Sequence, residues 1–188
     1  METGMTRPLT FTLVLSQSAM QAVSEPEGSD PISEHSREVE ADPNNATAYL
    51  ARGIAHLKAL DFDSAIADFT KVIELNPNDD GAYTNRGGAH YEKAEFYCAV
   101  ADLKRALEIN PKSALAHSNL GWTYEAMHDE RNAIVHYRKA LEIDPSLQAA
   151  RDNLKLLDAP LECEILNWPH ELRKDGARLP KRRPAPVV

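Results

Sequence analysis

The stretch that decides the fold is written three times in this chain, as VIELNP at residues 72–77, ALEINP at residues 106–111 and ALEIDP at residues 140–145. Each copy begins 34 residues after the previous one, and Pro43 stands 34 residues before Pro77. A fixed period of this length indicates a repeat protein, in which each repeat is a small unit that buries its apolar face against its neighbours.

Small residues follow the same period. Within each repeat, apolar residues recur every three to four positions, which predicts two amphipathic helices per repeat. Small side chains where the two helices cross let them approach closely. A bulky residue at Gly87 is therefore expected to force its helix pair apart, at a cost of about 1–3 kcal/mol. The small residues in register are Gly53, Gly87 and Gly121, and Ala65, Ala99 and Ala133.

The helix boundaries are marked as well. Proline has no amide proton and disfavours the helical conformation of the residue before it. The second helix of each repeat is therefore predicted to end at Asn76, Asn110 or Asp144. The next helix is predicted to begin at once, because Asp79 and Ser113 can accept hydrogen bonds from its unpaired amides.

These residues resemble the tetratricopeptide repeat, a 34-residue helix–turn–helix unit. In its register the repeats are residues 46–79, 80–113 and 114–147. The resemblance implies an all-α fold, a short right-handed α-solenoid of antiparallel helix pairs. We call the positions within the 34-residue unit places 1 to 34. Some residues depart from the pattern of the family and are expected to weaken local packing: Arg52 and Arg86 at place 7, His56 and His90 at place 11, and Val72 at place 27.

The chain has 188 residues, which predicts one folded domain with a segment at each end. The repeat domain is predicted to span 32–158, with a stub helix over 32–41 and a capping helix over 148–158 that covers the last repeat. Residues 1–31 are predicted to be a disordered or signal-like leader followed by an acidic linker. Residues 159–188 are predicted to be an irregular basic tail rich in proline. The capping side chains are expected to be Leu154, Leu156 and Leu157.

The chain has a formal net charge of −8, and the lack of a long apolar stretch predicts no transmembrane segment. Arg7 and the apolar run from Leu9 to Leu15 resemble a secretory signal, but two threonines interrupt the run and no clean cleavage site follows. We therefore expect a cytoplasmic protein, with an exported or periplasmic one as the alternative. The basic residues from Arg173 to Arg183 invite a nucleic-acid or anionic-surface interpretation, but they lack interleaved aromatics, and a solvated tail is expected instead.

No catalytic arrangement is evident in the sequence, so we expect no enzyme and no cofactor. The histidines do not have the spacing of a zinc motif, and the glycine pair at 87–88 lacks the lysine of a phosphate-binding loop. The two cysteines form neither a metal motif nor a disulfide framework. Cys98 is expected to be a small packing residue beside Ala99.

The resemblance implies that the first helices of the repeats line a concave groove, with places 2, 5, 6, 9, 12 and 13 facing it. An apolar strip, two amides that can hold a peptide backbone, and large aromatic surfaces of the kind found at binding hot spots are expected there. The candidate groove residues are Leu50, Ile54, Leu57, Thr84, Asn85, Tyr91, Asn119, Trp122 and Glu125.

Members of the family that capture acidic chaperone tails clamp the carboxylate with cations and asparagines at five groove places. Those places hold two amides and no cation in this chain: Leu50, Ile54, Asn85, Leu115 and Asn119. We therefore expect a protein-interaction module or adaptor whose groove binds an apolar helix or extended segment of a protein or peptide partner. A self-assembling scaffold is the alternative, and the leader or tail of the same chain could instead cover the groove.

Overall fold

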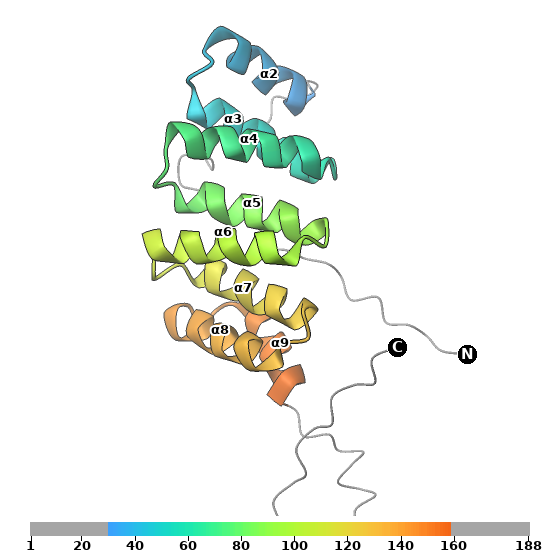
Figure 1. Cartoon of the computed structure of the whole chain (residues 1–188), viewed down its shortest axis with the longest axis vertical. Coiled ribbons are helices and arrows are strands. Elements are labelled where there is room, and N and C mark those ends of the chain that lie inside the picture. The colour runs from blue at the N-terminus through green and yellow to red at the C-terminus, as the bar shows by residue number, and fades with distance from the viewer. Residues whose placement is uncertain (1–29, 159–188) are drawn as a thin grey trace, which may run out of the picture. The chain divides into compact units, whose positions relative to one another are not determined.

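The computed structural model describes residues 30–158, and every regular element in that range is an α-helix (Figure 1). The predicted all-α solenoid of helix pairs is confirmed. Each repeat is one pair, α3 on α4, α5 on α6 and α7 on α8, and the pairs stack in sequence order. The helices are α2 (Pro31–Ala41), α3 (Ala46–Lys58), α4 (Phe62–Leu75), α5 (Asp80–Glu92), α6 (Phe96–Ile109), α7 (Ala114–Ala126), α8 (Glu130–Ile143) and α9 (Gln148–Asp158).

The glycines at place 8 let the two helices of a pair meet. A Cβ added at Gly53 would lie 2.8 Å from a ring carbon of Phe69, and one added at Gly121 would lie 2.8 Å from the ring of Tyr137. Phe69 and Tyr137 are fully buried, so their rings fill the space that the missing side chains leave. The sequence-based explanation of these small residues is confirmed.

The turn between the two helices of a pair has the same backbone in every repeat. Its central residue is left-handed, with φ values of 61° at Leu60, 59° at Ala94 and 60° at His128. These residues carry a side chain where glycine would relieve the strain. The turn fixes where the second helix begins, and thus where residues 95–98 lie relative to α5.

The predicted helix ends and caps are confirmed. Asp79 accepts a hydrogen bond from the amide of Ala82 at 2.9 Å, and Ser113 accepts one from Ala116 at 3.2 Å. Asn76 ends α4 with an extended backbone before its proline, and its side chain accepts a hydrogen bond from the amide of Asn78. The same short turn connects the later repeats.

The expected stub helix exists as α2, which is capped by Asp30 and begins with Pro31 at its first position. It packs against α3 and buries Val39. At the other end α9 packs on α8 through Ala150, Leu154 and Leu157. The expectation for Leu156 was wrong, because its side chain is 57% exposed.

The arginines at place 7, which the sequence suggested would weaken local packing, form ion pairs that join the two helices of their repeats. Arg86 donates two hydrogen bonds to the buried Asp102, at 2.7 and 2.8 Å, and a third to Thr70 of the preceding repeat at 3.0 Å. Arg52 makes the same paired contact with Asp68, at 2.7 and 2.9 Å. Bonding to the carboxylate raises the pKa of each guanidinium. Such fork-like pairs fix the relative position of two helices.

The third repeat replaces the ion pair with a neutral arrangement. Leu120 stands at place 7, and His136 stands where the earlier repeats have aspartate. The Nδ1 atoms of His117 and His136 lie 3.1 Å apart, so one ring donates and the other accepts. Burial, and then the neighbouring His117, lowers the pKa of His136 to about 4, which keeps this ring neutral at pH 7.

Candidate functional site

The candidate interaction surface is the first-helix face, which we define as places 2, 5, 6, 9, 12 and 13 of α3, α5 and α7. Neighbouring first helices pack on one another, α3 on α5 and α5 on α7, so the face continues from repeat to repeat. Of the nine candidate residues, five are buried and four are half-buried. The buried ones are Leu50, Ile54, Thr84, Asn85 and Asn119, and the half-buried ones are Leu57, Tyr91, Trp122 and Glu125.

The expected apolar strip is thus not an open surface in this structure. Leu50 is 5% exposed and Ile54 is 2% exposed, and both belong to a core cluster with Phe69, Ala82 and Ala89. A charged residue at Leu50 would therefore disrupt the core as well as any groove. Leu57, which is half-buried beside this cluster, is the part of the strip that solvent reaches.

The two predicted hot-spot aromatics come together. The rings of Tyr91 on α5 and Trp122 on α7 have centroids 6.1 Å apart, and the ring centroid of Phe96 lies 5.7 Å from that of Tyr91. All three side chains are half-buried. The cluster spans the boundary between the second and third repeats and presents apolar area from both.

The polar candidate residues are held by the fold. The hydroxyl of Thr84 donates to the carbonyl of Asp80 at 2.8 Å, so it belongs to its own helix. Glu125 accepts a hydrogen bond from the hydroxyl of Tyr137 at 2.9 Å. Asn85 and Asn119 are each 1% exposed, in equivalent places of α5 and α7. Burial raises the pKa of Glu92, a further carboxylate of this face.

A hollow of about 380 Å³ opens at the N-terminal end of the face. It lies between the start of α3 and the turn that joins α4 to α5. Its lining combines the methyl groups of α3 with polar groups from the turn: Ala46, Thr47, Leu50, Asn76, Asn78, Asp79 and Asp80. It is too polar and too open to hold a small apolar ligand.

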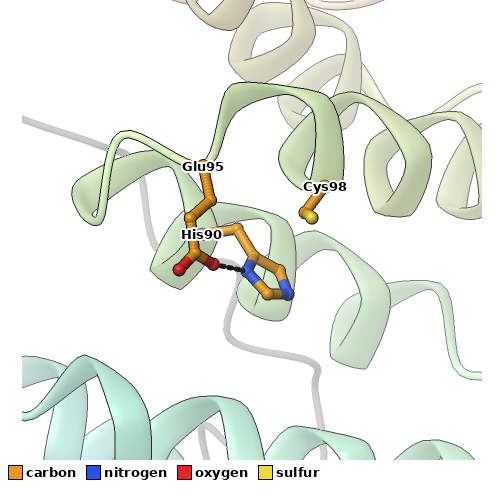
Figure 2. A group of neighbouring side chains, drawn as sticks. All are labelled: His90, Glu95 and Cys98. Atoms are coloured by element: carbon orange, nitrogen blue, oxygen red, sulfur yellow. Dashed lines mark hydrogen bonds and ion pairs between the residues drawn. The ribbon is translucent and has the colours of Figure 1, made fainter.

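A second group of side chains, which the sequence did not predict, gathers at the turn between α5 and α6. Figure 2 shows His90 approaching Glu95 and Cys98 from the facing helix. His90 Nδ1 lies 2.7 Å from a carboxylate oxygen of Glu95, and the potential ligand atoms of the three residues lie within 4.8 Å of one another. Cys98 is exposed, so the expectation that it is a packing residue was wrong.

Lys93 anchors this turn to the preceding repeat. Its ammonium lies 2.6 Å from Asp63 and 2.9 Å from Glu95, and these two carboxylates raise the pKa of Lys93 to about 12. The hydrogen bonds that Glu95 accepts from Lys93 and His90 lower its own pKa. The carboxylate of Glu95 is therefore ionised at neutral pH and points toward His90.

Stacked helix pairs with these small-residue crossings and proline-terminated helices define an α-solenoid repeat protein. The family model described as "Tetratricopeptide repeat" matches residues 46–79 and 114–147, the first and third repeats. The chain is a tetratricopeptide repeat protein. A search of curated proteins gave no match.

Several solved structures are similar to this chain. The crystal structure of MamA is 28% identical with a TM-score of 0.63, over 67% of this chain and 74% of that one. The Arabidopsis OM64 TPR domain is 27% identical with a TM-score of 0.59, over 60% and 93%. The first TPR of Spaghetti (RPAP3) bound to an HSP90 peptide is 26% identical with a TM-score of 0.59, over 62% and 92%.

The fold is that of a protein-interaction module, because tetratricopeptide repeat proteins in general act by binding other proteins and not by catalysis. None of the helices in residues 30–158 has the length and apolar character needed to cross a membrane. The predicted contributions of residues 1–29 and 159–188, including Cys163, lie outside the described residues.

Proposed function

We propose that this chain is an adaptor that binds an apolar helix or an extended apolar segment of another protein on its first-helix face. The observation that supports this most strongly is the aromatic cluster of Tyr91, Phe96 and Trp122, which joins two repeats and is half-exposed. Large aromatic side chains at the centre of a surface are the residues that contribute most to protein–protein binding.

The composition of the face favours an apolar partner over an acidic one. The RPAP3 structure holds a peptide of HSP90, a sequence that contains two glutamates and ends in aspartate. In this chain the clamp places hold Leu50, Ile54 and Leu115 together with two asparagines, and none holds a cation. Apolar area without a cation favours an apolar helix or extended segment, so the acidic-tail mode is disfavoured here.

Two alternatives remain distinct from this proposal. In the first, the leader or tail of the same chain covers the face. In the second, copies of the chain stack end to end through an incompletely capped N-terminal repeat. That hypothesis is less attractive now that α2 packs against α3 and carries the acidic residues Glu34, Glu38 and Glu40.

The test is a crosslinking pull-down with the full chain, comparing it with Trp122→Ala. We expect the variant to lose the specific partners, because the half-buried ring of Trp122 is the part of the aromatic cluster that the third repeat contributes. Tyr97→Ala is the matched control, since Tyr97 is also aromatic but lies on the second helix of its repeat with 82% exposure. Circular dichroism checks that both variants stay folded. Leu50 is left unchanged because it belongs to the core.

Partners kept by Trp122→Ala and lost in Tyr97→Ala would place the interaction elsewhere and overturn the proposal. A second arm uses the chain without residues 1–29. Stronger capture by this shortened chain would show that the leader competes for the same face. Light scattering over a range of concentrations separates self-assembly, which predicts a mass that grows with concentration, from a monomeric adaptor.

A further inference from the structure

We propose that His90, Glu95 and Cys98 form a binding site for a thiophilic divalent cation, with zinc as the best match. The three side chains supply an imidazole nitrogen, a carboxylate oxygen and a thiol sulfur, whose nearest atoms lie within 4.8 Å of one another (Figure 2). These are the three ligand types that zinc prefers in proteins. The site does not depend on the proposed function.

The other repeats show that this combination is specific to the second one. In the first repeat the equivalent residues are His56, Asp61 and Ser64, and the carboxylate of Asp61 caps α4 by accepting the amide hydrogen bond of Ser64. In the third repeat Asp129 caps α8 in the same way through Asn132. The first and third repeats thus pack with an aspartate at the position of Glu95 and without a thiol at the position of Cys98.

Glu95 does not cap its helix in this way. The N-terminus of α6 has no side-chain cap hydrogen bond, although Glu95 occupies the cap position. Its longer side chain lies 2.7 Å from Nδ1 of His90, whereas Asp61 of the first repeat both caps its helix and lies 3.3 Å from Nδ1 of His56. The helix therefore lacks the stabilising side-chain cap that α4 and α8 have. A ligand that joins the carboxylate to His90 and Cys98 would offset that loss.

The surroundings suit a bound cation. With Nδ1 of His90 on the metal, its Nε2 faces the carboxylate of Asp102 at 3.9 Å, which is longer than a hydrogen bond. A rotation of the imidazole that brings the two into hydrogen-bonding distance would let this second carboxylate orient the zinc-bound ring. Cys98 binds as the thiolate and releases its proton to solvent. Glu95 and the Cys98 thiolate then carry two negative charges, which match the charge of the ion. Arg86 is paired with Asp102, and Lys93, which lies 2.9 Å from Glu95, is also paired with Asp63 at 2.6 Å.

The site also has room for a fourth ligand. Around a tetrahedral zinc the ligand atoms lie roughly 3.5 Å apart, so the ligand atoms that are farthest apart here must come about 1 Å closer when the metal binds, and the side chain of Cys98 is exposed and can rotate. A hollow of about 470 Å³ adjoins the site and is lined by Glu95, Tyr97, Cys98 and Met127, among others. Water can complete the coordination there. The metal would tie the end of α5 to the start of α6.

The experiment measures cobalt and zinc binding by the full chain after treatment with a chelator. A cobalt–thiolate bond gives a charge-transfer absorption in the near ultraviolet, which reports a sulfur ligand directly. We expect one equivalent of metal and this absorption in the unchanged chain and in Cys163→Ser. Cys98→Ser, which restores the residue of the first repeat, is expected to lose the absorption and at least about tenfold in zinc affinity.

Two further readouts make the result decisive. Zinc should raise the melting temperature of the unchanged chain, because it binds only the folded site, and it should not do so for Cys98→Ser or Glu95→Gln. His56→Gln, in the first repeat, should leave metal binding unchanged. No thiolate absorption in the unchanged chain, or an absorption that survives Cys98→Ser and disappears in Cys163→Ser, would overturn the proposal.

Discussion

At the scale of single residues, the ion pairs inside the repeats show how two places change together. Arg86 and Asp102 form a buried pair in the second repeat, whereas the third repeat has Leu120 and His136 at the same two places. A buried charge is tolerated only with its partner, so losing one member is worse than losing both.

Replacing one partner of this pair is expected to be costly. Arg86→Leu leaves Asp102, which is 7% exposed, without its guanidinium and should lower the free energy of unfolding by about 3–5 kcal/mol. The double variant Arg86→Leu/Asp102→His copies the third repeat and should recover most of that loss. Urea unfolding of the three proteins measures both values. A double variant no more stable than the single one would contradict this explanation.

The histidine pair of the third repeat should make stability depend on pH. The pKa of His136 falls from about 6.5 when unfolded to about 4 when folded, because of burial and then of His117. Below pH 6.5 the unfolded chain therefore binds a proton that the folded chain does not, so stability is full above that pH and is lost as pH falls toward 4. Burial lowers the pKa of His117 as well, in the same direction.

Between pH 7 and pH 5 the free energy of unfolding is expected to fall by roughly 1–2 kcal/mol more in the unchanged chain than in His136→Gln. The comparison with the variant removes the contribution of the carboxylates, which both proteins share. Chemical unfolding at the two pH values measures it. Equal losses in the two proteins would show that His136 titrates normally in the folded chain.

At the scale of elements, the glycines at place 8 set how closely the helices of a pair approach, and they differ in tolerance. At Gly53 an added Cβ meets the buried ring of Phe69 at 2.8 Å, whereas at Gly87 it meets the side chain of Leu103 at 3.1 Å and a backbone oxygen at 3.3 Å. An aromatic ring packed between helices has less freedom to move than a leucine side chain.

Gly53→Ala is therefore expected to destabilise the chain by about 1–3 kcal/mol through overpacking. This loss exceeds the stabilisation expected from the higher helix propensity of alanine. Gly87→Ala should cost less, because Leu103 can yield by a few tenths of an ångström. Melting temperatures of the two variants test the order. If Gly87→Ala proved the more destabilising, the backbone contact at Ala99 and not the side chain would control the spacing.

At the scale of the whole described array, stability is a sum of repeat terms and neighbour contacts, so the ends open first. Residues 45–57 would form the exposed N-terminal edge of the three repeats, but α2 covers α3 there. Since α2 buries only Val39, it becomes the weak end. Hydrogen exchange should be fastest in α2 and slowest in α5 and α6. Amides of α2 as protected as those of α6 would contradict this order.

The repeat period, the helix boundaries and the small crossing residues followed from the sequence, because each depends on local rules: proline ends a helix, and glycine leaves room for a neighbour. Tertiary structure alone decided which side chains are accessible. Leu50 and Ile54 are buried in the core, because neighbouring first helices pack against one another. Arg86 pairs with Asp102, which is sixteen residues away in the sequence. His90 met Cys98 only because a left-handed turn at Ala94 folds α6 back onto α5.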